Sequence, residues 1–159
     1  ATTHSVDGIR DIATVIGDLQ KTTSAIAAAI SIASVPAMAN SINLNQFGWG
    51  NAAGGEQFGW GNNIGVDQSG AWNTMVGSQF GIGNTAAVGQ QGINNFADTW
   101  QNGVGNAAGV GQFGSDHNAI LTQDGNGNIA AGVQVGNGCN AGVAQTGAGN
   151  VAAFVQACP

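Results

Sequence analysis

The chain has 159 residues, of which 28 are Gly, and its formal net charge of −6 comes from eight acidic and two basic residues. Two cations, Arg10 and Lys21, cannot neutralise a row of phosphates, so the composition excludes nucleic acid as a partner. The length suits one domain with a continuous core, but the richness in Gly, Asn and Gln is also typical of disordered segments, and only a strict period argues against disorder.

Residues 1–39 carry the pattern of an amphipathic helix. Their apolar residues recur at alternating steps of three and four, which is helical spacing. Ser5 or Asp7 can cap the start of the helix, and Pro36 ends it. We therefore expect a helix from about residue 6 to 34, about 43 Å long. Its apolar stripe comprises Ile9, Ile12, Ile16, Leu19, Ile26 and Ile30.

The same segment also resembles a secretion signal. Residues 25–39, AIAAAISIASVPAMA, look like the apolar region of a signal peptide that ends in Ala-x-Ala, and a chain that starts at Ala1 without Met suggests a processed N-terminus. The acidic residues Asp7, Asp11 and Asp18 precede the stretch, which argues against a retained signal. The stretch is shorter than the roughly 20 apolar residues of a membrane span, so we expect none.

From residue 40 onward the sequence repeats every eleven residues. Gly follows each recurring Gln by two residues, Asn follows it by five, and Ala stands two beyond the Asn in most units. The recurring Gln residues are Gln46, Gln57, Gln68, Gln79, Gln90, Gln101, Gln112, Gln123, Gln134, Gln145 and Gln156. The recurring Asn residues are Asn40, Asn51, Asn62, Asn73, Asn84, Asn95, Asn106, Asn128 and Asn150, with His117 and Cys139 in two further slots.

This period predicts an all-β fold, a β-solenoid over residues 40–159 with the N-terminal α-helix before it. Alternate residues of a strand share a face, so Asn, Ala, an apolar residue and the next Gln lie together on a seven-residue strand. The four residues between Gln and the next Asn, mostly x-Gly-x-Gly, are expected to form a turn. Two units facing each other make a coil of 22 residues, and such coils stack about 4.8 Å apart. We expect eleven strands, about five and a half coils, from 40–46 to 150–156.

Stacking places each Gln above a Gln and each Asn above an Asn two units away. Their side-chain amides are expected to form hydrogen-bonded ladders along the axis, because such ladders satisfy polar groups that are costly to bury unpaired. Gln and Asn therefore recur at a fixed interval because identical side chains must stack.

The pattern Gln-x-Gly-x-x-Asn-x-Ala, repeated every eleven residues over residues 40–156, resembles the curlin repeat of bacterial curli fibre subunits. The resemblance implies a secreted, extracellular subunit that polymerises into an amyloid-like fibre of the biofilm matrix or cell surface, with secretion and nucleation partners. The chain departs from the family in having Asn almost throughout where alternate strands usually open with Ser. Residues 1–39 also differ from the family's short targeting segment.

The helix is longer than the roughly 24 Å that six stacked strands span. We expect it to dock on a smooth strip of outward positions, which we assign to the even-numbered sheet because small residues allow close approach. It either reaches a neighbouring subunit and staples the polymer, or packs only on its own solenoid. The strip comprises Gly65, Ala87, Gly89, Ala107, Gly109, Gly111, Ala131 and Val133.

Two cysteines fall near each other in the expected stack. Cys139 replaces an inward Asn, and Cys158 lies one rung away in the final turn. This placement is compatible with a disulfide and with an oxidising extracellular location, while two buried thiols are the alternative. We interpret His117 as a hydrogen-bonding substitute for Asn rather than a catalyst, and neither His lies near the cysteines, so no metal site is expected.

The remaining residues offer no catalytic constellation, phosphate loop or cofactor motif, so we expect neither enzymatic activity nor a cofactor. Six aromatic residues of the first units either stack on carbohydrate or pack between subunits or against the helix. They are Phe47, Trp49, Phe58, Trp60, Trp72 and Phe80.

Two classes of function remain after these exclusions. The first is a structural subunit whose open strand edges, nearly free of charge, pair head to tail into a homopolymer. The second is a monomeric solenoid that binds ice or glycans. Ice binding needs a regular outward array, and the outward column here is irregular: Ala52, Thr74, Phe96, Asn118 and Asn140.

Overall fold

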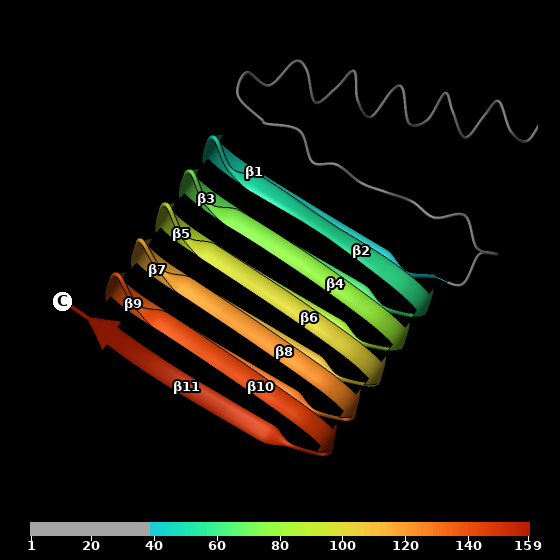
Figure 1. The fold of residues 1–159 in the computed structure, drawn as a ribbon. Coiled ribbons are helices and arrows are strands. Elements are labelled where there is room, and N and C mark those ends of the chain that lie inside the picture. Colours follow the sequence, from blue (N-terminus) through green and yellow to red (C-terminus); the bar gives the residue numbers. More distant parts are fainter. Residues whose placement is uncertain (1–38) are drawn as a thin grey trace, which may run out of the picture.

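The computed structural model describes residues 39–159, which form a β-solenoid of eleven strands (Figure 1). The strands are β1 (Ser41–Trp49), β2 (Ala52–Trp60), β3 (Asn63–Ala71), β4 (Thr74–Ile82), β5 (Thr85–Ile93), β6 (Phe96–Val104), β7 (Ala107–Ser115), β8 (Asn118–Asn126), β9 (Ile129–Asn137), β10 (Asn140–Ala148) and β11 (Val151–Cys158). The expected all-β solenoid of eleven strands is confirmed. The expected helix of residues 6 to 34 and its apolar stripe lie outside the described residues.

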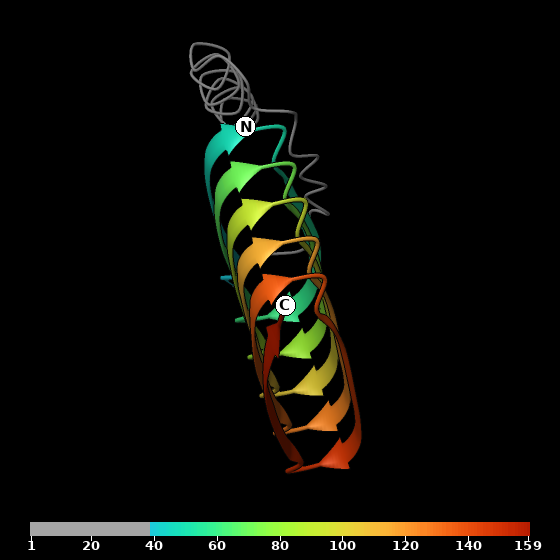
Figure 2. The ribbon, with the colours of Figure 1, turned by 90° about the vertical axis from the view of Figure 1, so that its left-hand side faces the viewer.

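Successive strands alternate between two parallel sheets. The odd-numbered strands form a six-stranded sheet in the order β1-β3-β5-β7-β9-β11, and the even-numbered strands form a five-stranded sheet from β2 to β10. Each strand pairs in register with the strand 22 residues away, so that Gln68 lies beside Gln90. Figure 2 shows the two layers and the turns that connect them along both sides. The smooth strip lies on the six-stranded sheet, because Gly65 belongs to β3, so its assignment to the even-numbered sheet is wrong.

The core between the sheets is narrow and is built from the inward position of every second residue. Ala is the most frequent residue in one slot, and the next slot holds residues of very different size, from Gly to Phe154. Large side chains of the same strand or of other strands fill the space at the glycine slots. A Cβ added at Gly77 would lie 2.9 Å from Met75 Cε and 3.2 Å from Ile64 Cδ1, and one at Gly132 would overlap the ring of Phe154. The slots therefore fill jointly rather than one by one.

The turns are shorter than the sequence predicts. Each strand from β1 to β10 continues for three residues beyond its Gln, and only two residues, such as Gly50 and Asn51, lie between consecutive strands. The Gly two residues after Gln has φ between 104° and 132°, yet it pairs with the same Gly of the next coil, as Gly70 does with Gly92. The expected four-residue turn is wrong because this conformation bends the strand while the residue stays in register with its neighbour.

The Gly column provides a test of this close stacking. A Cβ at Gly92 would lie 1.8 Å from Gly114 O at a φ of +132°, whereas one at Gly89 in the same strand would meet nothing within 4 Å. Gly92→Ala should therefore lower the free energy of unfolding by about 1–3 kcal/mol or more. Gly89→Ala should leave it unchanged or raise it by about 0.4–1 kcal/mol. Denaturant unfolding followed by circular dichroism measures both. Equal midpoints would contradict the stacking.

Candidate functional site: amide ladders and open strand edges

Two columns of Gln side chains run the length of the solenoid, one in each sheet. In both columns Nε2 donates to Oε1 of the Gln 22 residues later, at 2.7–3.0 Å. The second proton of Nε2 goes to a backbone carbonyl of the opposite sheet, as from Gln90 to Thr74 O at 2.9 Å. From Gln68 to Gln134 the amides of both columns are buried and fully engaged. Each ladder therefore also ties the two sheets together.

The Gln ladders have a fixed direction. The amide atom that faces a backbone carbonyl must be the nitrogen, because a carbonyl oxygen cannot donate. Since Nε2 makes this contact from Gln57 to Gln156, the amides of one column cannot be flipped relative to one another. Within each ladder, the donors point toward the C-terminal end and the acceptors toward the N-terminal end.

The Asn columns work differently from the expected side-chain ladder. Oδ1 of one Asn accepts from the backbone N–H of the Asn one coil later, as in Asn84 N to Asn62 Oδ1 at 3.0 Å. Nδ2 donates to carbonyls of the turn, as from Asn84 to Phe80 O and Gly103 O. Direct Asn-to-Asn amide bonds start only from Asn73, Asn95 and Asn150. The Asn side chains therefore mainly hold the turns, at the residues where strand pairing stops.

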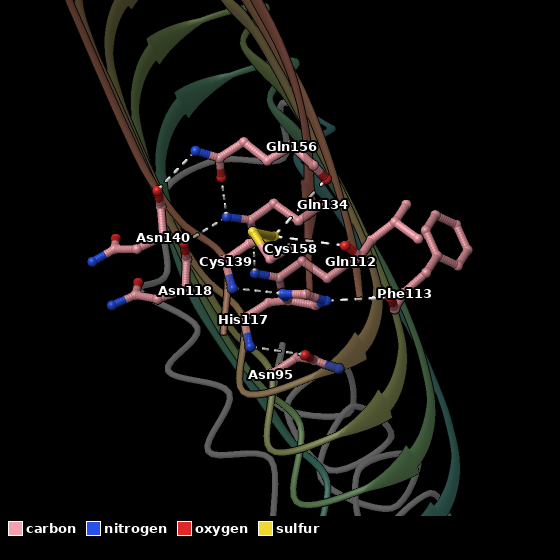
Figure 3. The surroundings of a disulfide bond; sticks show 11 residues. Asn95, Gln112, Phe113, His117, Asn118, Gln134, Cys139, Asn140, Gln156 and Cys158 are labelled. Atoms are coloured by element: carbon pink, nitrogen blue, oxygen red, sulfur yellow. Dashed lines mark hydrogen bonds between the residues drawn. A yellow bond between two sulfur atoms is a disulfide. The ribbon is translucent and has the colours of Figure 1, made fainter. Parts of the chain in front are cut away.

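His117 fills its Asn slot with equivalent hydrogen bonds (Figure 3). Its backbone N–H donates to Asn95 Oδ1 at 3.1 Å, and its Nδ1 accepts from the backbone N–H of Cys139 at 3.2 Å. Since Nδ1 accepts, the ring proton lies on Nε2 and is donated to Phe113 O, 3.2 Å away. Both ring nitrogens are therefore engaged in holding a turn.

Cys139 and Cys158 are joined in a disulfide, with an S–S distance of 2.08 Å and a Cα–Cα distance of 5.6 Å (Figure 3). Cys139 stands in the inward Asn column, and Cys158 is the last residue of β11. The bond attaches the final strand, which among the described strands has a neighbour on one edge only, to the body of the solenoid. Among residues 39–159, no three His, Cys, Asp or Glu side chains gather as metal ligands would.

Each end of the solenoid presents two strand edges without a neighbour in the described chain: β1 and β2 at one end, β10 and β11 at the other. The only charged side chain on these four strands is Glu56 in β2. Several of the most exposed large apolar side chains lie here, with Phe47 78% and Trp49 72% exposed on β1 and Val155 80% exposed on β11. Natural proteins normally protect open edges with charge, so these edges are unusually well suited to pairing.

The six expected aromatic residues do not form one patch. Phe47 and Trp49 lie on β1, whereas Phe58 and Phe80 stack on the five-stranded sheet with ring centroids 5.4 Å apart. Trp100 of β6 lies in a different column, beside Ser78, and its ring reaches to 6.5 Å from that of Phe80, so the three rings form one cluster. The 22-residue register alone places Asn102 beside Phe80 and therefore does not predict this diagonal contact.

The outer faces of the two sheets differ in relief. Part of the smooth strip, including Gly65, Ala87 and Gly109, lines a shallow depression on the six-stranded sheet together with Asp67. On the five-stranded sheet, Asp98 stands between Val76 and Ile120 of the neighbouring strands. Burial raises the pKa of the Asp98 carboxyl above its usual value.

Residues 92–125 match a family model described as the curlin associated repeat. The matched span contains all of β6 and β7 and nearly all of β8, including three rungs of the Gln ladders. A comparison with curated proteins finds no match to the chain. Between residues 39 and 159, no helix is long and apolar enough to cross a membrane.

The Gln ladder can be tested with two substitutions in one strand. Gln90→Leu removes the acceptor of Gln68 Nε2 and the donor to Gln112 Oε1, and should cost about 1–3 kcal/mol for each buried group left unpaired. Gln91→Leu makes the same change at an exposed neighbour and should alter stability by less than about 0.5 kcal/mol. Chemical unfolding of both variants gives the comparison, and an equal loss would contradict the ladder's role.

Reduction of the disulfide should free β11. We expect a loss of about 3 kcal/mol, from the entropy of the closed loop, concentrated in hydrogen-exchange protection of β11 rather than β5. As a control, Cys139→Asn with Cys158→Gly restores both column residues, and reductant should not change that variant. Unchanged protection of β11 in the reduced wild-type chain would contradict this role.

Asp98 should make stability depend on pH. The folded state holds the Asp98 proton more tightly than the unfolded chain does. The free energy of unfolding therefore increases as pH falls from the raised pKa of the folded state toward 3.8, the ordinary pKa of an Asp carboxyl. Asp98→Asn should therefore be more stable than wild type at pH 7, with a difference that shrinks on acidification. Thermal unfolding from pH 7 to 4 measures this. Asp67→Asn removes the same charge from an exposed position, and an identical profile for it would refute the assignment.

Proposed function

We propose that the chain, whose residues 92–125 match the curlin associated repeat and whose described strands are open at both ends, is a structural subunit that polymerises head to tail. The polymer is an amyloid-like fibre of the cell surface or biofilm matrix. The observation that carries the proposal is the pair of open ends, where four strand edges bear a single charged side chain, that of Glu56. Edges of this kind pair with further strands.

The hydrogen-bonding groups at the two ends are complementary. Gln145 and Gln156 each use one Nε2 proton on a carbonyl of the same chain, which leaves the second proton for a further acceptor. At the other end, none of the described side chains donates to Oε1 of Gln46 or Gln57. A head-to-tail contact joins donors to acceptors, whereas a contact between two like ends opposes donor to donor or acceptor to acceptor. The proposed polymer therefore has a direction, with a donor end and an acceptor end.

The disulfide supports an extracellular location, because such bonds persist in oxidising compartments. Export and fibre initiation would require secretion and nucleation partners in addition to further copies of the chain. The N-terminal helix remains a prediction. Its proposed docking site is the smooth strip, on its own subunit or on a neighbour, where the shallow depression accepts a helix without large side chains in the way.

A monomeric module that binds glycans is the second candidate. It is supported by the exposed Trp60 and the stacked rings of Phe58 and Phe80 on one face. Ice binding has less support, because the outward column that contains Thr74, Phe96 and Asn118 offers no regular array.

Electron microscopy tests the proposed function directly. The purified full chain, and a copy that lacks residues 1–39, are incubated at increasing concentration and examined for filaments and for fibre diffraction at about 4.8 Å. We expect filaments from the full chain. Their fraying in the truncated copy would make the helix a staple between subunits. Monomers that persist at every concentration would favour the binding module.

A pair of variants links filament growth to the end groups. Gln156→Glu replaces the donor at the C-terminal edge with a charged acceptor and should slow elongation from preformed seeds. Gln91→Glu introduces the same charge at an exposed outward position away from the ends and serves as the control. Equal elongation rates would contradict the proposed role of the edge amides.

A further inference from the structure

The solenoid of residues 39–159 has an odd number of strands, and this decides how one subunit can follow another. Strands alternate strictly between the sheets, so β1 and β11 both belong to the six-stranded sheet. If the coil continued beyond β11, the next strand would lie in the other sheet, beside β10. The two ends of the solenoid therefore do not match by simple translation along the axis.

We propose that the next copy continues the coil without a gap, so that its β1 pairs with β10 and its β2 pairs with β11. This inference rests on the proposed function and specifies its geometry. Each subunit is then turned by about half a revolution relative to the one before. Eleven half-coils at about 4.8 Å per coil give a rise of about 26 Å per subunit.

The alternative is a copy that follows by translation, with its β1 on β11. That arrangement forms one strand pair at the junction and leaves β10 and the next copy's β2 facing an empty strand position. The gap-free arrangement forms two pairs and leaves no vacancy. Each unpaired edge leaves a row of backbone donors and acceptors without partners. The gap-free arrangement is therefore favoured.

The side-chain amides fit the same register. Gln145 and Gln156 donate to Gln46 and Gln57 of the next copy, which continues both ladders. The second Nε2 proton of that Gln46 meets the carbonyl of Val151, the counterpart of Ile129 O, which accepts from Gln145 at 2.9 Å within the chain. Every ladder group at the junction obtains the partner that its equivalent has inside the solenoid.

The exposed aromatic residues of β1 also find suitable neighbours. Within the chain Trp49 lies beside Ala71 and Phe47 beside Ser69. In the proposed junction they lie beside Ala148 and Thr146 of the preceding copy, again small residues. The two β1 side chains, 72% and 78% exposed in the single chain, would thus be covered on both sides.

The half-turn makes the two faces alternate along the fibre. The smooth strip of one subunit and the Phe58–Phe80–Trp100 cluster of the next lie on the same side. A ligand or helix that recognises one sheet would therefore find its site on opposite sides of successive subunits, about 52 Å apart along each side, or twice the rise.

Electron cryomicroscopy of filaments of the unmodified chain tests the proposal through helical symmetry. We expect a rotation near 180° and a rise of about 26 Å per subunit. A rotation near 0° with a rise of about 29 Å, the value for six full coils, would overturn this inference and leave the proposed function intact. The absence of filaments would overturn both.

A charge swap tests the junction independently. In the proposed register Val155 faces Glu56 of the next copy. Val155→Glu should therefore slow elongation about two- to fivefold by like-charge repulsion, and adding Glu56→Lys should restore the wild-type rate. Val133→Glu, one coil inward in the same outward column, should not respond to Glu56→Lys. If the change at position 56 fails to rescue Val155→Glu, the proposed pairing of β11 with β2 is wrong.

Discussion

The in-register stacking of identical amides is the interaction on which the rest of the structure depends. Each buried Gln satisfies the Gln before it, the Gln after it and a carbonyl of the opposite sheet, so it joins coils and sheets at once. The apolar part of the core is only two slots wide, and one of these holds Gly at Gly55, Gly77 and Gly132. Without the ladders, a core this thin would bury polar groups without partners, each at a cost of about 1–3 kcal/mol.

The sequence alone predicted the strands, the alternation of the sheets and the inward faces, because the inward Asn, Ala and Gln slots recur with nearly the same residue type. It failed where one residue type fits two geometries. Gly after each Gln is typical of a turn, yet Gly92 has positive φ and remains in the strand. The period also identified Asn84 as a stacked residue without showing which of its atoms pair, so its role in holding the turn was missed.

Other features depend on several eleven-residue units together, so the sequence of one unit does not predict them. The space at Gly77 is filled by Met75 of the same strand and Ile64 of the opposite sheet, and that at Gly132 by Phe154, and only the assembled stack shows which residue supplies the volume. The substitution of His117 for Asn succeeds for a similar reason: the ring places an acceptor and a donor where the column needs them. The column tolerates a change of residue when it conserves the direction of the hydrogen bonds.

Both sheets use the same inward order of Asn, Ala, apolar residue and Gln, so a strand could occupy either sheet without changing its core side chains. Insertion of a single residue would turn every inward amide downstream to the outside. Insertion of a whole eleven-residue unit would preserve them all and transfer the downstream strands to the opposite sheet. Whole units can therefore be gained or lost while the inward side chains stay inward. Only the outward-facing residues then distinguish a strand of one sheet from a strand of the other.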